Sequence, residues 1–179
     1  MSATSNWLVY SPLIGNDSQW MYLNLGNEAQ TSGNNNEYPT NKVNPTSSVV
    51  TVNGSGSSNN INISGQNTIM YCFASIPGYS KIGSYNGTGA SGNVQYLGFQ
   101  PSWLMIKNIT NTGSTGWAIL DTARGGTTGN GKALFANSNG SEWTNNTIDI
   151  DFTATGFTIQ NSYVVVNGGS DSYIYLAIA

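Results

Sequence analysis

The sequence predicts an all-β protein: a lectin-like or jelly-roll β-sandwich built from two related repeats, of which the first is truncated. Short apolar runs rich in β-branched and aromatic residues recur along the 179-residue chain, which is typical of strands. Asn-Gly pairs, which favour tight turns, lie between such runs. No window combines a sustained 3.6-residue apolar period with helix caps at both ends. These patterns indicate many short strands.

Four runs are the clearest strand predictions. They are residues 68–74 (TIMYCFA), 103–109 (WLMIKNI), 117–121 (WAILD) and 173–179 (YIYLAIA). Tight turns are expected at four Asn-Gly pairs, Asn53-Gly54, Asn86-Gly87, Asn139-Gly140 and Asn167-Gly168.

An internal repeat organises the chain. Trp7 in NWLVYSP corresponds to Trp117 in GWAILDT, and the stretch ending at Ala74 corresponds to the stretch ending at Ala179. Between these anchors, both copies carry a strand-like YLN or LFAN, then an Asn-rich loop, then VVTV or GFTI. The second copy has a further leading part, residues 78–108, with no counterpart in the first.

The repeat predicts a truncated first copy over residues 1–75 and a second copy over 76–179, fused into one sandwich. The truncation leaves an open sheet edge, which either the second copy or a strand donated by another subunit covers. Fusion predicts a single core with contributions from Trp7, Val9, Ile69, Tyr71, Leu104, Ile106, Trp117, Ile119, Ile174 and Leu176. A fragment of residues 76–179 is then expected to be insoluble or molten alone.

Composition excludes several classes of function. The chain has no His, so a Ser-His-Asp or Cys-His relay is impossible and the usual zinc ligand is missing. The single cysteine, Cys72, permits no internal disulfide, and its apolar run predicts an inert buried thiol. A net charge of −3 argues against nucleic acid as a partner. No apolar run approaches the roughly 18 residues that a membrane span needs. We expect no cofactor.

Two acidic residues and one glycine-rich stretch are candidate sites with simpler structural interpretations. GTGASG at residues 87–92 fits the dinucleotide-binding pattern, but a strand-like segment follows it where a helix is required. Asp149 and Asp151 alternate with apolar residues, which predicts a half-buried strand with a polar face. The same two carboxylates are weak calcium candidates, and a glycosidase pair is a further alternative.

Asp121 and Arg124 in LDTARGG are predicted to form a local ion pair that fixes the chain after the strand at 117–121. The guanidinium fork suits a carboxylate or a backbone corner better than lysine does. A contact to a neighbouring subunit is the alternative interpretation.

The chain has five Trp and ten Tyr, which is many aromatic residues for its size. Trp103 and Trp117 lie in apolar runs and are expected in the core. Trp20 and Trp143 lie in polar surroundings and are candidates for exposed stacking on a sugar or for a subunit contact. Partial burial at the rim of the sandwich is the alternative for both.

The residues YCFASIPGYSKIGSYNGTG, the GF-x-P-x-W-L-x-IK at 98–107 and the W…D-x-x-R at 117–124 resemble a β-rich repeat of tailed-bacteriophage virion proteins. These are tail-fibre-like and virion-surface structural proteins. The match covers residues 68–179 well and 6–74 more loosely. The resemblance implies a lectin-like β-sandwich on a virion surface, and it implies no catalytic residues.

The expected function is therefore that of a non-enzymatic virion-surface structural protein, a fibre or capsid-decoration subunit that contacts host surface glycans. Its expected partners are copies of itself, other virion proteins and a host glycan, with no membrane or nucleic acid. A soluble carbohydrate-binding module is the alternative. A polysaccharide-degrading enzyme using Asp or Glu is a third hypothesis, although no motif pairs the carboxylates.

Overall fold

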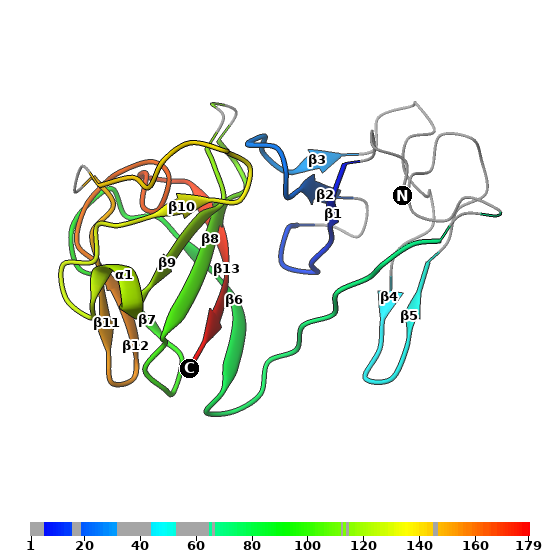
Figure 1. Cartoon of the computed structure of the whole chain (residues 1–179), viewed down its shortest axis with the longest axis horizontal. Helices are drawn as coiled ribbons and strands as arrows, with labels where there is room; N and C mark the ends of the chain where they lie inside the picture. Colours follow the sequence, from blue (N-terminus) through cyan, green and yellow to red (C-terminus); the bar gives the residue numbers. More distant parts are fainter. Residues whose placement is uncertain are drawn as a thin grey trace. The chain divides into compact units, whose positions relative to one another are not determined.

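The computed structural model describes residues 6–15, 19–31, 44–52, 65, 67–111, 113, 115–144 and 147–179 (Figure 1). The chain forms two compact units. The first unit comprises Met1–Leu23 and Ala29–Cys72, and the second comprises Asn24–Glu28 and Phe73–Ala179. The boundary between Cys72 and Phe73 lies close to the expected boundary after residue 75, but a short piece of the first repeat belongs to the second unit.

The described chain is all-β, as predicted, with one four-residue helix. The second unit contains β6 (Ser80–Asn86), β7 (Asn93–Tyr96), β8 (Trp103–Asn108), β9 (Ala118–Asp121), α1 (Thr122–Gly125), β10 (Leu134–Phe135), β11 (Ile150–Thr153), β12 (Gly156–Ile159) and β13 (Ser172–Ile178). The first unit contains β1 (Leu8–Val9), β2 (Gln19–Tyr22), β3 (Gln30–Thr31), β4 (Asn44–Pro45) and β5 (Val50–Thr51).

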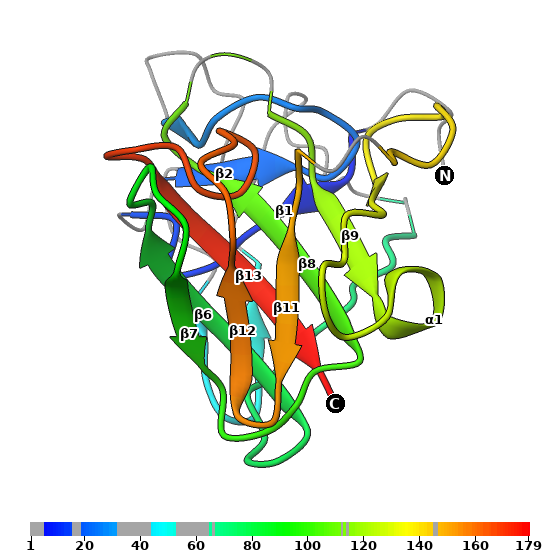
Figure 2. The same ribbon diagram turned by 90° about the vertical axis from the view of Figure 1, so that its left-hand side faces the viewer.

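The second unit is a β-sandwich of two antiparallel sheets. One sheet has five strands in the order β10-β9-β8-β13-β6, and the other has three in the order β11-β12-β7. Figure 2 shows the three-stranded sheet in front of β6, β8 and β13. The C-terminal strand β13 lies inside the larger sheet, where β6 and β8 pair with its two edges.

The core lies between these two sheets. Alternation along β8 buries Leu104 and Ile106, and Phe157 and Ile159 of β12 contribute from the opposite sheet. Further core residues are Tyr85, Leu97, Phe99, Ala118, Leu120, Ala133, Ile148, Ile150, Phe152, Val165, Val166, Tyr173, Tyr175 and Ala177. All of them belong to the second unit, so this unit has a core of its own.

The antiparallel pair β1–β2 of the first copy and the pair β9–β10 of the second copy have the same register. In the first copy Leu8 pairs with Tyr22, and in the second Ala118 pairs with Phe135. The next pairs along are Val9 with Met21 and Ile119 with Leu134. Each hairpin also has a backbone hydrogen bond to the tryptophan carbonyl, from Leu23 to Trp7 at 2.8 Å and from Ala136 to Trp117 at 3.1 Å. The sequence repeat is therefore a repeat of a β-hairpin.

A second hairpin is repeated in the same way. The VVTV strand β5 pairs with β4, and the GFTI strand β12 pairs with β11. Residues 46–49 connect β4 to β5 in the first copy, where the Thr46 N–H donates to the Val49 carbonyl at 2.8 Å, and residues 154–155 connect β11 to β12 in the second. Two hairpins of the second copy thus have counterparts in the first unit.

The predicted strand at 68–74 is absent, and this prediction is wrong. Residues 67–75 belong to no strand, and Figure 1 draws them without an arrow. Trp7, Ile69 and Tyr71 were predicted to be core residues but are 46%, 56% and 67% exposed, so no single core includes them. The physical reason is that the matching strand β13 is held by β6 and β8, and no described strand occupies those places beside 68–74. Cys72, predicted to be buried, is exposed for the same reason.

Candidate functional site

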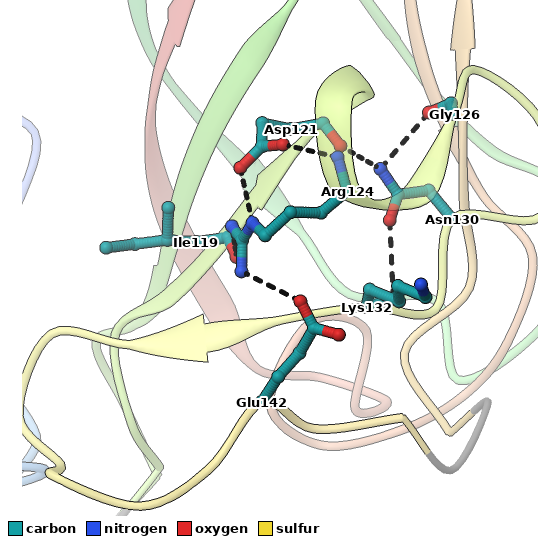
Figure 3. Close-up of polar contacts among 7 residues, drawn as sticks. All are labelled: Ile119, Asp121, Arg124, Gly126, Asn130, Lys132 and Glu142. Carbon is teal, nitrogen blue, oxygen red and sulfur yellow. Dashed lines mark hydrogen bonds and ion pairs between the residues drawn. The ribbon is translucent and has the colours of Figure 1, made fainter.

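The Asp121–Arg124 pair lies at the corner where β9 ends and α1 begins (Figure 3). Asp121 caps the helix, because its Oδ1 accepts a hydrogen bond from the backbone N–H of Arg124 at 2.8 Å. Its Oδ2 accepts from Arg124 Nε at 2.6 Å. Arg124 Nη2 then donates to the carbonyl oxygen of Ile119 at 3.1 Å. The guanidinium fork therefore joins the carboxylate to the strand that precedes it, as expected for a structural clamp.

Asn130 fixes the same corner from the other side. Its buried amide donates to the carbonyl oxygens of Asp121 and Gly126, at 2.9 and 3.2 Å. The backbone N–H of Lys132 donates to Asn130 Oδ1 at 3.3 Å (Figure 3). A Cβ atom at Gly125 would collide with this amide, so a glycine is needed there. The turn after α1 is thus determined by side-chain hydrogen bonds and close packing.

Two opposing effects act on the Asp121 carboxyl group. Partial burial raises its pKa, while hydrogen bonds and the charge of Arg124 lower it, and the resulting pKa is below the ordinary value. Glu142 Oε2 lies 3.7 Å from Arg124 Nη1 and completes a small charge cluster (Figure 3). The side chains of Asp121, Arg124 and Glu142 are 22%, 23% and 31% exposed. Arg124 already bonds Asp121 and the Ile119 carbonyl, so both carboxylates of the cluster neutralise a guanidinium with a structural role.

A buried lysine is the most unusual group of the second unit. Lys107 of β8 is completely buried, and its Nζ lies within hydrogen-bond distance of four oxygen atoms. The partners are the carbonyl oxygens of Gly26 (3.1 Å), Asn108 (2.9 Å) and Thr115 (2.6 Å), and the hydroxyl of Thr115 (3.1 Å). Burial lowers the pKa of Lys107 to about 8, although the charge of Glu28 acts in the opposite direction. Through Gly26, the ammonium group thereby holds residues 24–28 against the rest of the second unit.

A second buried network surrounds Asn108 at the end of β8. Asn108 Nδ2 lies within hydrogen-bond distance of three acceptors: the carbonyl oxygen of Val164 (3.0 Å), Asp171 Oδ2 (2.9 Å) and the Tyr173 hydroxyl (3.1 Å). Tyr173 donates its hydroxyl hydrogen to Val164 at 2.7 Å and accepts from the backbone N–H of Gly168 at 2.7 Å. These bonds anchor the loop between β12 and β13 to the end of the larger sheet.

Asn167 holds the GTGASG loop in place. Its buried amide oxygen accepts from the Thr88 backbone and from Asn93 Nδ2, both at 2.8 Å. Its amide nitrogen donates to the carbonyl oxygens of Ala90 and Asn161, both at 2.7 Å. The loop connects β6 to β7, with no helix following it. Its backbone is therefore fixed by asparagine in a strand–loop–strand context that differs from a dinucleotide site.

Comparison with known proteins gives a family for this chain. The family model DUF7483, a domain of unknown function, matches residues 1–179. The chain belongs to the DUF7483 family. No curated protein and no solved structure matches the chain. Among the described residues of this DUF7483 chain, no helix is long and apolar enough to cross a membrane.

The acidic pair of the DUF7483 chain does not offer a free set of oxygen ligands. Asp151 in β11 accepts from the Gly129 backbone N–H and from Gln160 Nε2, both at 2.7 Å. Asp149 precedes β11, and burial followed by the charge of Asp151 raises the pKa of its carboxyl group. No group of three His, Cys, Asp or Glu side chains suited to a metal occurs among the described residues. Donors already occupy both Asp151 oxygens, while Asp149 Oδ1 is buried without a hydrogen-bond partner, so the pair does not present two free carboxylates to calcium.

The two candidate tryptophans of the DUF7483 chain lie in different environments. Trp20 in β2 is 5% exposed, so its ring does not offer the exposed stacking face that was expected. The repeated hairpin explains the burial. Trp20 pairs with Gln30 in the first copy, and Ala133 pairs with Trp143 at the equivalent position of the second copy. Ala133 is fully buried. Trp20 thus occupies the position of a core residue.

Trp143 is half-buried and held by neighbouring side chains. Its ring stacks on Tyr163 at a centroid distance of 6.4 Å and meets Phe135 edge-on at 5.9 Å. Its Nε1 donates to the hydroxyl of Thr147 at 3.1 Å. This combination matches the rim alternative and leaves part of the indole accessible.

Sequence reasoning missed the buried polar residues of this DUF7483 chain. Asn108, Asn130 and Asn167 are fully buried in a sequence rich in asparagine, so composition concealed them. Lys107 had a usable signal, because a lysine inside the apolar run WLMIKNI is either exposed on one face or buried with acceptors. Its acceptors include three backbone carbonyls, which leave no signature in a sequence.

Proposed function

We propose that this chain is a non-enzymatic structural subunit of a bacteriophage virion surface, acting as a fibre or capsid-decoration component. The observation that carries the proposal is the use made of its ionisable side chains. Asp121 caps a helix, Asp151 accepts two N–H groups, and Lys107 is enclosed by oxygen atoms. General acid–base chemistry needs groups that face a substrate and exchange protons with it. These three side chains serve the fold.

The surface also supports an assembly role. Charged residues make up 7% of the chain, where about 25% is usual. Exposed apolar side chains gather in one segment, from Ile69 to Tyr79. Such a patch on a weakly charged surface is typical of a protein that contacts other subunits. The resemblance of residues 68–179 to virion-surface repeats supports the phage particle as the place of assembly.

Purified virions of a phage that carries the gene provide the test. Mass spectrometry of gradient-purified particles should detect the chain, and antibodies against it should label the particle surface in electron micrographs. A host cytosolic protein, measured in the same fractions, serves as the control for carry-over. Recovery of the chain solely in the soluble fraction of the lysate would contradict the proposal.

Carbohydrate binding at Trp143 is the second candidate function. Its indole is held by Tyr163 and Thr147 while remaining partly exposed, and aromatic rings presented in this way stack on sugar faces. A glycan array probed with the whole chain should show hits that Trp143→Ala removes. The matched control is Leu134→Ala, which truncates an exposed side chain of the neighbouring strand β10. An array without hits contradicts this second candidate and leaves the structural proposal standing.

A further inference from the structure

The connection between the two units exposes a concentrated apolar surface. Half of the twelve exposed large hydrophobic side chains among the described residues lie in this one stretch: Ile69, Met70, Tyr71, Phe73, Ile76 and Tyr79. Their exposed fractions run from 50% to 67%. Tyr71 stacks on Trp7, with ring centroids 6.3 Å apart, and the residues that the structure describes show no ring contact for the other five side chains. Side chains of this size seldom remain exposed to water together without a further partner.

The backbone of the same stretch is open as well. Within the described part of the chain, no backbone group from Ile69 to Phe73 makes a hydrogen bond. Ordered pairing begins just beyond, where Ser80 Oγ donates to the Ala74 carbonyl at 2.7 Å and Ile76 bridges to Ser80. Unpaired N–H and C=O groups beside apolar side chains form a template for another strand.

The sequence of this stretch is that of a paired strand. Residues 68–74 are the repeat counterpart of 173–179, and β13 pairs with β6 on one edge and with β8 on the other. No charged residue occurs between positions 43 and 80. Charged side chains are the usual means of keeping open strands apart, and this segment has none. The pattern is therefore suited to antiparallel pairing.

We propose that residues 69–73 pair antiparallel with the same residues of a second copy of this chain. A two-fold arrangement is self-complementary, so each copy supplies the uncharged apolar strand that the other requires. Centred on Tyr71, the pairing places Ile69 opposite Phe73 and Met70 opposite Cys72 of the other copy. Two short strands bury a modest area, so the association is reversible and depends on concentration.

This inference deepens the proposed function and rests on it, because it names a partner and a surface for the assembly role. The two are tested separately. A virion protein that stays monomeric in solution contradicts the pairing alone. A dimer that is absent from virions contradicts the virion role alone.

Cys72 allows a direct measurement on the full chain, because it is the sole cysteine and is exposed. Labelling it with pyrene should give excimer emission that rises with protein concentration, since the proposed register brings the two labels close together. Sedimentation velocity on unlabelled protein should show a monomer–dimer equilibrium over the same range.

Met70→Lys should abolish both signals, because it places a cation opposite Cys72 in each copy. Met70 is half-exposed and outside any strand, so the variant should keep its circular dichroism spectrum. Val94→Lys is the matched control: it adds the same charge at an exposed apolar position of β7 and should preserve both signals. Purely monomeric protein without excimer emission overturns the proposal. So does a dimer that survives Met70→Lys or is lost in Val94→Lys.

Discussion

Lys107 makes the stability of the second unit depend on pH. Its folded-state pKa of about 8 lies below the ordinary value of 10.5, so the unfolded chain binds more protons between these values and stability rises with pH. Between pH 8 and 10 the expected gain in unfolding free energy is about 2 kcal/mol, from roughly 1.4 kcal/mol per unit of pKa shift. Urea unfolding at pH 8, 9 and 10 measures it.

The variant Lys107→Met should lose this rise, because it has no proton to release. Lys132→Met, which removes an exposed lysine, should keep it. Above about pH 10 the trend reverses, because burial raises the pKa of Tyr85 and of Tyr173 and the folded state retains these protons longer. Stability of the native chain that is flat from pH 8 to 10 contradicts the assignment.

Asp121 should matter more for stability than Glu142, although both contact Arg124. Asp121→Ala removes a helix cap together with a short ion pair, for an expected loss of about 1–2 kcal/mol. Glu142→Gln breaks a 3.7 Å contact at the surface and should cost about 0–1 kcal/mol. Thermal unfolding of the two variants at neutral pH compares them directly, and equal losses would refute the clamp interpretation.

The pH dependence of the Asp121 contribution follows from its lowered pKa. The contribution is fully present above the ordinary carboxyl pKa of about 4 and is lost as pH falls through the lower folded-state value. Stability should therefore fall less steeply on acidification in Asp121→Ala than in the native chain.

At the scale of elements, the pairing of β7 with β12 depends on a glycine. Gly156 pairs with Tyr96, and a Cβ atom at this position would run into the backbone carbonyl of Gln95. Gly156→Ala should therefore separate the two strands and cost about 1–3 kcal/mol. Urea unfolding measures the loss, and faster amide hydrogen exchange in β7 locates it. Thr155→Ala, at the adjacent exposed turn position, should leave both measurements unchanged.

Strands were predictable from sequence where the chain also supplies their neighbours. The runs at 103–109, 117–121 and 173–179 match β8, β9 and β13 to within a residue or two. The equally apolar run at 68–74 forms no strand, because local pattern encodes the tendency to pair and says nothing about whether a partner lies beside it.

At the scale of the whole molecule, the second unit has a core of its own, which contradicts the prediction of one core shared by both repeats. A fragment of residues 73–179 contains every residue of the core cluster, so it should fold alone instead of being molten. Dispersed amide NMR signals and a cooperative urea transition are expected. The fragment lacks the Gly26 carbonyl that Lys107 uses, so its midpoint should be lower than that of the same unit in the full chain. A broad transition with poorly dispersed signals would show that the core needs the first unit.

The fold class could be predicted from the sequence because alternation and turn chemistry repeat along the whole chain. The Asp121–Arg124 pair could be predicted because its members are three residues apart. The oxygen atoms around Lys107 could not be predicted, since they come from residues 26, 108 and 115 and every residue carries a carbonyl group. Long-range contacts of this kind are specified by the completed fold.

The docking of residues 24–28 on the second unit has a consequence for a cleaved chain. Tyr71 and Phe73 are exposed, so a protease that cuts after aromatic residues should nick the connection in dilute solution. The N-terminal piece would still carry Gly26, whose carbonyl accepts the Lys107 ammonium inside the second unit. The two pieces should therefore separate on a denaturing gel yet elute together from a sizing column. Pieces that elute separately from the sizing column would show that the Gly26 contact does not hold the nicked chain together.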